Sequence, residues 1–187
     1  MHKAIEVYLV TGFLGSGKTA CLNHIIKNAP ADIKTMVLMN EFGATGIDGV
    51  LLETEDLNIV EINKGSIFCA CAKTDFIRAL AEIASKFKPD VLLIEATGVA
   101  NPSDIRRYLQ LPFFKGVFSF QKQICLVDLS NFLQEFETFG SACYQIKAAD
   151  LCLLNKSDLS DADQVTVVKD LIRRHNPKAV FQQTVFG

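Results

Sequence analysis

Several features are missing from this 187-residue sequence, and each absence argues against a class of function. It has no long cluster of lysines and arginines and its net charge is −2, so electrostatics give no reason to expect nucleic acid or an anionic membrane as a partner. No apolar run approaches the ~18 residues that a membrane helix needs. The apolar stretch at residues 4–10 is too short for the core of a signal peptide. We therefore expect a cytoplasmic protein.

The sequence also lacks internal repeats and low-complexity linkers. Its composition, 49% hydrophobic and 21% charged, is that of an ordinary globular protein, and we expect residues 1–187 to form a single domain. Six cysteines without a secretory signal favour reduced thiols over a disulfide framework. Cys125 and Cys152 lie in apolar runs, and Cys21 and Cys143 lie in helical patterns, so we expect all four in the core.

The strongest motif occupies residues 12–19 and matches G-x-x-x-x-G-K-[ST] at every fixed position. A strand pattern precedes it and a helical pattern follows it, which is the order that a phosphate-binding loop requires. Lys18 is expected to reach the β- and γ-phosphates and Thr19 to ligate Mg²⁺. The alternative is a glycine turn with a solvated lysine. The residues predicted to bind nucleotide here are Gly12, Gly15, Ser16, Gly17, Lys18, Thr19 and Ala20.

Acidic residues supply the next candidates. Glu95 closes the apolar run of residues 90–95, as expected of a Walker B strand, and would hold Mg²⁺ or orient the attacking water. Thr97 follows in a second switch segment, and we assign Lys18, Glu95 and Thr97 to catalysis. Residues 44–56 combine glycines and acids without a sustained period, as expected of a γ-phosphate sensor. Asp48 is the candidate Mg²⁺ ligand in that loop.

A third motif, N-K-x-D, follows the apolar strand of residues 150–154. Asp158 can accept hydrogen bonds from the N1–H and exocyclic amine of guanine, a donor pair that adenine lacks. Asn155, Lys156 and Asp158 are therefore predicted to bind the nucleotide and to select GTP. The alternative is a simple helix N-cap at Ser157 or Asp158.

Strand and helix patterns alternate along the whole chain. Strands are predicted at residues 35–39, 57–62, 90–95, 123–128, 150–154 and near 178–182, and helices at 20–27, 75–87, 103–109, 131–148 and 165–175. This alternation predicts an α/β fold of the P-loop NTPase class, with a mostly parallel sheet and helices on both faces.

Together these motifs resemble the CobW/HypB/UreG family of P-loop GTPases, and they look closest to its CobW branch. The resemblance implies a GTP- and Mg²⁺-dependent switch that delivers metal or a cofactor to a client metalloprotein. Phe13 stands where partitioning ATPases place a second signature lysine, which argues against that relative. Larger family members carry a C-terminal domain that this sequence lacks, so we expect a protein with a G domain alone or a fragment. The residues that carry the resemblance are 12–19, 40–43, 95–98 with 101–102, 149–150 before 155–158, and 176–177.

The sequence departs from the family in its metal motif, usually G-C-x-C-C. That motif falls on residues 65–69, where Ser66 and Phe68 replace two of the three cysteines. Cys69 and Cys71 could still supply two soft ligands for Zn²⁺, Co²⁺ or Ni²⁺, with Glu41 as a third. Two such loops would complete the coordination in a nucleotide-dependent homodimer. The alternative is a pair of small buried thiols.

The sequence is also compatible with two other functions. One is a GTPase chaperone of a corrinoid protein that has no metal site of its own. The other is a P-loop small-molecule kinase, for which Arg106 and Arg107 are the only candidate pair of lid arginines. A kinase would leave the N-K-x-D motif unexplained.

Overall fold

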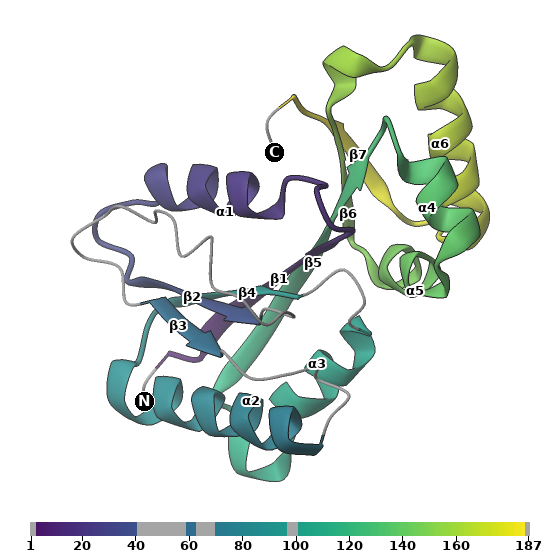
Figure 1. The fold of residues 1–187 in the computed structure, drawn as a ribbon. Coiled ribbons are helices and arrows are strands. Elements are labelled where there is room, and N and C mark those ends of the chain that lie inside the picture. The colour runs from purple at the N-terminus through teal and green to yellow at the C-terminus, as the bar shows by residue number, and fades with distance from the viewer. Residues whose placement is uncertain (1–2, 41–58, 63–69, 97–100, 186–187) are drawn as a thin grey trace.

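The computed structural model describes residues 3–40, 59–62, 70–96 and 101–185 (Figure 1). Within these ranges strands and helices alternate, as predicted. The strands are β1 Ile5–Gly12, β2 Thr35–Asn40, β3 Ile59–Ile62, β4 Val91–Glu95, β5 Phe118–Asp128, β6 Leu151–Asn155 and β7 Val180–Gln183. The helices are α1 Lys18–Lys27, α2 Ala70–Glu82, α3 Pro102–Leu109, α4 Phe132–Thr138, α5 Gly140–Ala148 and α6 Ala162–His175. Shorter helical segments are η1 Ile83–Phe87, η2 Pro112–Phe114 and η3 Ser157–Leu159.

The seven strands form one sheet in the order β3-β2-β4-β1-β5-β6-β7. Each pairing is parallel, so the predicted parallel α/β fold is confirmed. β1 lies at the centre, between β4 and β5. Because parallel strands all end at the same edge, the residues that follow β1 and its neighbours meet at one edge of the sheet.

The handedness of the connections decides which face each helix covers. Crossovers between parallel strands are right-handed, so a connection toward the β3 edge covers the opposite face from a connection toward the β7 edge. The connection from β1 to β2 runs toward the β3 edge. The connections through α2, α3, α5 and α6 run toward the β7 edge. α1 accordingly lies on one side of the sheet in Figure 1, and α2 and α3 lie on the other.

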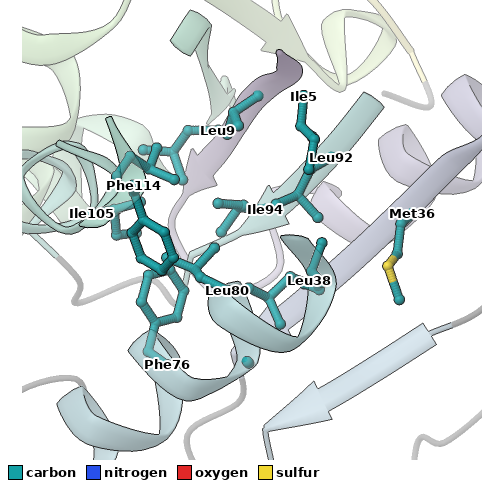
Figure 2. Packing of buried hydrophobic residues seen from close by; sticks show 14 of the residues in the cluster. Ile5, Leu9, Met36, Leu38, Phe76, Leu80, Leu92, Ile94, Ile105 and Phe114 are labelled. Atoms are coloured by element: carbon teal, nitrogen blue, oxygen red, sulfur yellow. The ribbon is translucent and has the colours of Figure 1, made fainter. Parts of the chain in front are cut away.

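Buried apolar side chains hold these layers together. On one face, Phe76 and Leu80 of α2 and Ile105 of α3 pack on strand residues that include Leu38, Leu92 and Ile94 (Figure 2). On the other face, Leu22 and Ile26 of α1 pack on Val10, Val37 and Leu93. A third cluster joins α4, α5 and α6 to β5 and β6. The core therefore fixes β1 and α1, the two elements that flank the glycine loop.

Two predicted elements differ from the structure. The helix expected at residues 131–148 is two helices, because Phe139 adopts an extended backbone and α5 begins at Gly140. β5 begins at Phe118, five residues before the predicted start at Gln123, across a bulge in its pairing with β1. Exposed Gln121 and Lys122 interrupt the apolar pattern there, which hid the first half of the strand.

Of the cysteines expected in the core, Cys21, Cys125 and Cys152 are buried. Burial raises the pKa of the Cys21 and Cys125 thiols to about 11. Cys143 is only half-buried, and its sulfur lies 3.8 Å from Nδ1 of His175. Within the described ranges, no helix is both long and apolar enough to cross a membrane.

Candidate nucleotide-binding site

Four central strands end in the residues that form the candidate site. Val10 pairs with Glu95, Gly12 with Leu126, and Asp128 with Asn155 across neighbouring strands. The ends of β1, β4, β5 and β6 are therefore side by side at one edge. They carry Gly12, Glu95, Asp128 and Asn155 respectively.

The loop after β1 depends on glycine at defined positions. Gly12, Gly15 and Gly17 have φ values of 144°, 77° and 99°, a region that L side chains rarely adopt. Two of these glycines also have close neighbours. A Cβ on Gly12 would lie 2.5 Å from the Leu126 carbonyl oxygen, and one on Gly17 would lie 2.4 Å from Nδ2 of Asn155. The loop backbone thus packs directly against the ends of β5 and β6.

Lys18 begins α1 and is folded back into the loop. Its ammonium donates to the carbonyl oxygens of Gly12 at 3.1 Å and Phe13 at 2.9 Å. Burial lowers the pKa of Lys18, while the negative charge of Glu95 acts in the opposite direction. The lysine ammonium and the Glu95 carboxylate are therefore within electrostatic reach of each other beside the glycine loop.

The N-K-x-D segment is attached directly to this loop. The side-chain amide of Asn155, which is buried, donates to the backbone oxygen of Ser16 at 2.9 Å. Asp158 lies in η3 and is exposed to solvent. The two motifs, separated by most of the chain, are thus joined by a direct hydrogen bond at the edge of the sheet.

Lys156 lies between these two residues and makes an ion pair with Asp128. Its Nζ is 2.6 Å from Oδ2 of that carboxylate, whose side chain is only 2% exposed. Burial acts to raise the pKa of Asp128, but hydrogen bonds from Lys156, Ser130 and Asn131 outweigh it and lower the pKa. Asp128 is therefore ionised at neutral pH.

An aromatic contact supports the loop from another direction. The rings of Phe13 and Phe139 are 4.7 Å apart, so the residue that divides α4 from α5 packs on the loop. Glu135 of α4 is half-buried and lies near Phe13. Its pKa is raised mainly by burial and, to a smaller extent, by the negative charge of Asp128. Leu14, by contrast, is 84% exposed at the tip of the loop.

Some of the remaining predicted residues lie in the described part of the chain, and others lie outside it. Thr19 and Ala20 follow Lys18 in the first turn of α1 and are exposed. Glu41, Asp48, Cys69 and Thr97, predicted to bind metal or act in catalysis, lie outside the described residues. Cys71 belongs to the first turn of α2. Among the residues that the structure does describe, no three His, Cys, Asp or Glu side chains are grouped to hold a metal ion.

Arg106, proposed for a kinase lid, has another role in this fold. Its guanidinium lies 4.2 Å from the centroid of the Phe120 ring and donates to the Ala148 carbonyl oxygen at 3.1 Å. It also pairs with Asp150 at 3.4 Å. These contacts join α3 to β5, to the end of α5 and to the residue before β6, so Arg106 is a packing residue. The kinase alternative therefore loses one of its two candidate lid arginines.

Sequence reasoning missed Asp128. The apolar run of residues 123–128 predicts the strand, but the sequence motifs assign no role to the acid that ends it. The available signal was the one used for Glu95, an acid that closes a buried apolar run at the same edge of a parallel sheet. Phe139 carried no comparable signal, because its contact with Phe13 joins distant parts of the chain.

A pair of glycine variants tests this loop geometry. The Cβ of Gly15→Ala would have no atom within 4 Å, so this substitution introduces only backbone strain. We expect a loss of about 1–2 kcal/mol in the free energy of unfolding. Gly17→Ala should cost more, because its Cβ also displaces the Asn155 amide from Ser16. Urea unfolding measures both. Equal losses, or an unchanged cost of Gly17→Ala in an Asn155→Ala background, would contradict this account.

Comparison with known proteins supports a family assignment. The chain is 36% identical over 154 residues to a protein of Escherichia coli strain K12 named zinc chaperone YeiR, covering 80% of this chain and 46% of that protein. It is 32% identical to zinc-regulated GTPase metalloprotein activator 1 of Schizosaccharomyces pombe, covering 98% of this chain and 46% of the other. The chain thus spans about half the length of these curated relatives.

A solved structure agrees with the sequence comparison. The Zn(II)-bound YjiA GTPase from Escherichia coli superposes with a TM-score of 0.68 at 27% identity, covering 98% of this chain and 58% of that one. The profile described as the CobW/HypB/UreG nucleotide-binding domain matches residues 6–183. This match includes both the glycine loop and the Asn155 segment, and we conclude that the chain belongs to the CobW/HypB/UreG family.

Proposed function

We propose that this chain is a GTP-binding switch domain that couples nucleotide state to delivery of a metal ion. The hydrogen bond from Asn155 to the Ser16 carbonyl oxygen carries the proposal, because it joins the base-recognition segment to the phosphate loop. Gly12, Gly15, Gly17 and the other loop residues would then bind phosphates while Asp158 reads the base.

Mg²⁺ is the ion that the fold implies beside the phosphates. Thr19 is exposed at the start of α1, and the charge of Glu95 reaches Lys18, so a hydroxyl and a carboxylate are both available near the loop. Oxygen ligands of this kind suit Mg²⁺. We propose Thr19, Glu95 and Asp48 as its ligands or water-mediated partners, and Thr97 as a residue of the second switch. Bound Mg²⁺ would neutralise charge on the β- and γ-phosphates.

Guanine selectivity is proposed from the carboxylate of Asp158. It is exposed at the edge of the sheet, where it can accept both guanine donors. Adenine would leave the carboxylate without those donors, which costs binding free energy.

The Asp158→Asn substitution tests this selectivity. The amide can donate to the second carbonyl group of xanthine but repels the guanine amine, so we expect at least tenfold weaker GTP binding and improved binding of xanthosine triphosphate. Competition against a fluorescent GTP analogue measures both affinities. Asp163→Asn, an exposed acid in the first turn of α6, is the matched control and should change neither. A wild-type preference for ATP would refute the proposal.

Hydrolysis is proposed to be slow without a partner. Residues 91–101, which contain Glu95 and Thr97, include no arginine that could stabilise the transferred phosphoryl group. We expect turnover on the order of 10⁻² s⁻¹ or less, as in switch GTPases that lack such an arginine. Phosphate release under saturating GTP measures it. A rate of tens per second for the isolated protein would favour a metabolic enzyme.

Metal delivery is proposed from two observations. The relatives are named as zinc chaperones and metalloprotein activators, and this chain retains Cys69 and Cys71 beside its altered metal motif. Two thiolates fill half of a tetrahedral site, so two more ligands are needed. Glu41 would supply one of them, and a second copy of the chain would supply two further thiolates. The client would be a metalloprotein. The corrinoid alternative predicts no metal bound by the chain itself.

A metal titration distinguishes these possibilities. Reduced protein with a non-hydrolysable GTP analogue should bind about one Zn²⁺ or Co²⁺ per dimer, and linkage requires the metal to tighten nucleotide binding by the same factor. Calorimetry with analytical ultracentrifugation measures stoichiometry and assembly. Cys69→Ser or Cys71→Ser should abolish binding, while Cys143→Ser, which removes a half-buried thiol on α5, should not. Binding that ignores nucleotide, or that survives both substitutions, would refute this arrangement.

A further inference from the structure

Asp128, the last residue of β5, is a buried carboxylate with an unusually complete set of donors. Oδ1 accepts from the backbone N–H and the hydroxyl of Ser130, at 3.0 and 2.5 Å. Oδ2 accepts from Nδ2 of Asn131 at 3.1 Å and from Nζ of Lys156 at 2.6 Å. Ser130 and Asn131 are near neighbours in sequence, so Lys156 is the partner that connects Asp128 to the segment after β6. A buried charge with these contacts holds its cation in one position.

The backbone conformation of Lys156 suggests what its ion pair with Asp128 stabilises. Its φ of 60° and ψ of 38° place it in the left-handed region, which is unfavourable for a residue with a Cβ. This conformation changes the direction of the chain between Asn155, at the end of β6, and η3, which contains Asp158. A strained conformation of this kind persists only when surrounding contacts enforce it.

The contacts around Lys156 do enforce it from several directions. Before Lys156, the Asn155 carbonyl oxygen accepts from Leu129 N at 3.1 Å, while the Asn155 amide holds Ser16. After it, Ser157 N donates to the Thr184 carbonyl oxygen at 3.1 Å. The ion pair with Asp128 fixes the Lys156 side chain, which is 30% exposed, between these two anchors. The position of Asp158 relative to the phosphate loop follows from this turn.

We propose that Asp128 is a positioning residue for guanine recognition, acting through Lys156 to hold the turn that presents Asp158 to the base. This inference deepens the proposed function and rests on it. Asp128 is not assigned a contact with the nucleotide. It orients the residues that make the contact.

The Asp128→Asn substitution removes the negative charge of this side chain and keeps its shape. Asparagine is nearly isosteric and its oxygen can still accept from Ser130, but its NH₂ group then faces Lys156 and Asn131, which are both donors. The Lys156 ammonium therefore loses its carboxylate and moves toward solvent. The left-handed turn loses one of its restraints, and the distance from Asp158 to the loop becomes variable.

The experiment compares dissociation constants for GDP and inosine diphosphate, which lacks the exocyclic amine that Asp158 accepts from. In Asp128→Asn we expect the preference for GDP over inosine diphosphate to fall about tenfold. Lys156→Met should lower the preference equally, and the double variant should lower it no further, because both substitutions remove one interaction. Lys156 is partly exposed, so its variant tests the proposal even where Asp128→Asn fails to fold.

Asp150→Asn is the matched control. This residue lies immediately before β6 and also pairs with a cation, Arg106 at 3.4 Å, but at the opposite end of that strand from Asn155. It is expected to alter thermal stability and to leave the nucleotide preference unchanged. If Asp128→Asn and Lys156→Met weaken both nucleotides equally, the role of Asp128 is only structural and the inference is wrong. A wild-type protein that does not prefer GDP would instead refute the proposed guanine site.

Discussion

The close approach of the glycine loop to the ends of β5 and β6 is the constraint on which the site depends. Gly12 lies against the Leu126 carbonyl oxygen and Gly17 against the Asn155 amide, with no room for a Cβ at either position. This proximity allows Asn155 to bind Ser16 directly. The segments assigned to phosphate and to base are therefore in direct contact through their backbones and the Asn155 side chain.

Buried charge is the second organising feature of this edge. Lys18 is held by carbonyl oxygens of its own loop, and the Asp128 carboxylate is held by Lys156 and its neighbours. Each buried ion is compensated by specific donors or acceptors, as burial in a protein interior requires. Such groups cannot change position independently. This favours a site whose described part is largely set before the nucleotide binds.

The proposed nucleotide and metal sites rest on different parts of the chain. The phosphate loop, Asn155 and Asp128 lie on the central strands and are anchored by the buried clusters. The thiols proposed for metal precede or begin α2, which follows the edge strand β3. Glu95, at the end of β4, lies between these two regions, because β4 pairs with β2 on one side and with β1 on the other.

The class of fold and the nucleotide motifs could be predicted from the sequence, because both depend on local patterns. Alternating apolar runs and helical periods predicted the parallel sheet, and the spacing of residues 12–19 predicted the loop. Two features became visible only in the folded chain: Phe139 divides a helix and packs on Phe13, and Asp128 pairs with Lys156. Those contacts join residues far apart in the chain, and no local pattern encodes them. They arise from the strand order, which places β5 between β1 and β6 and so brings the end of each strand within hydrogen-bonding distance of the next.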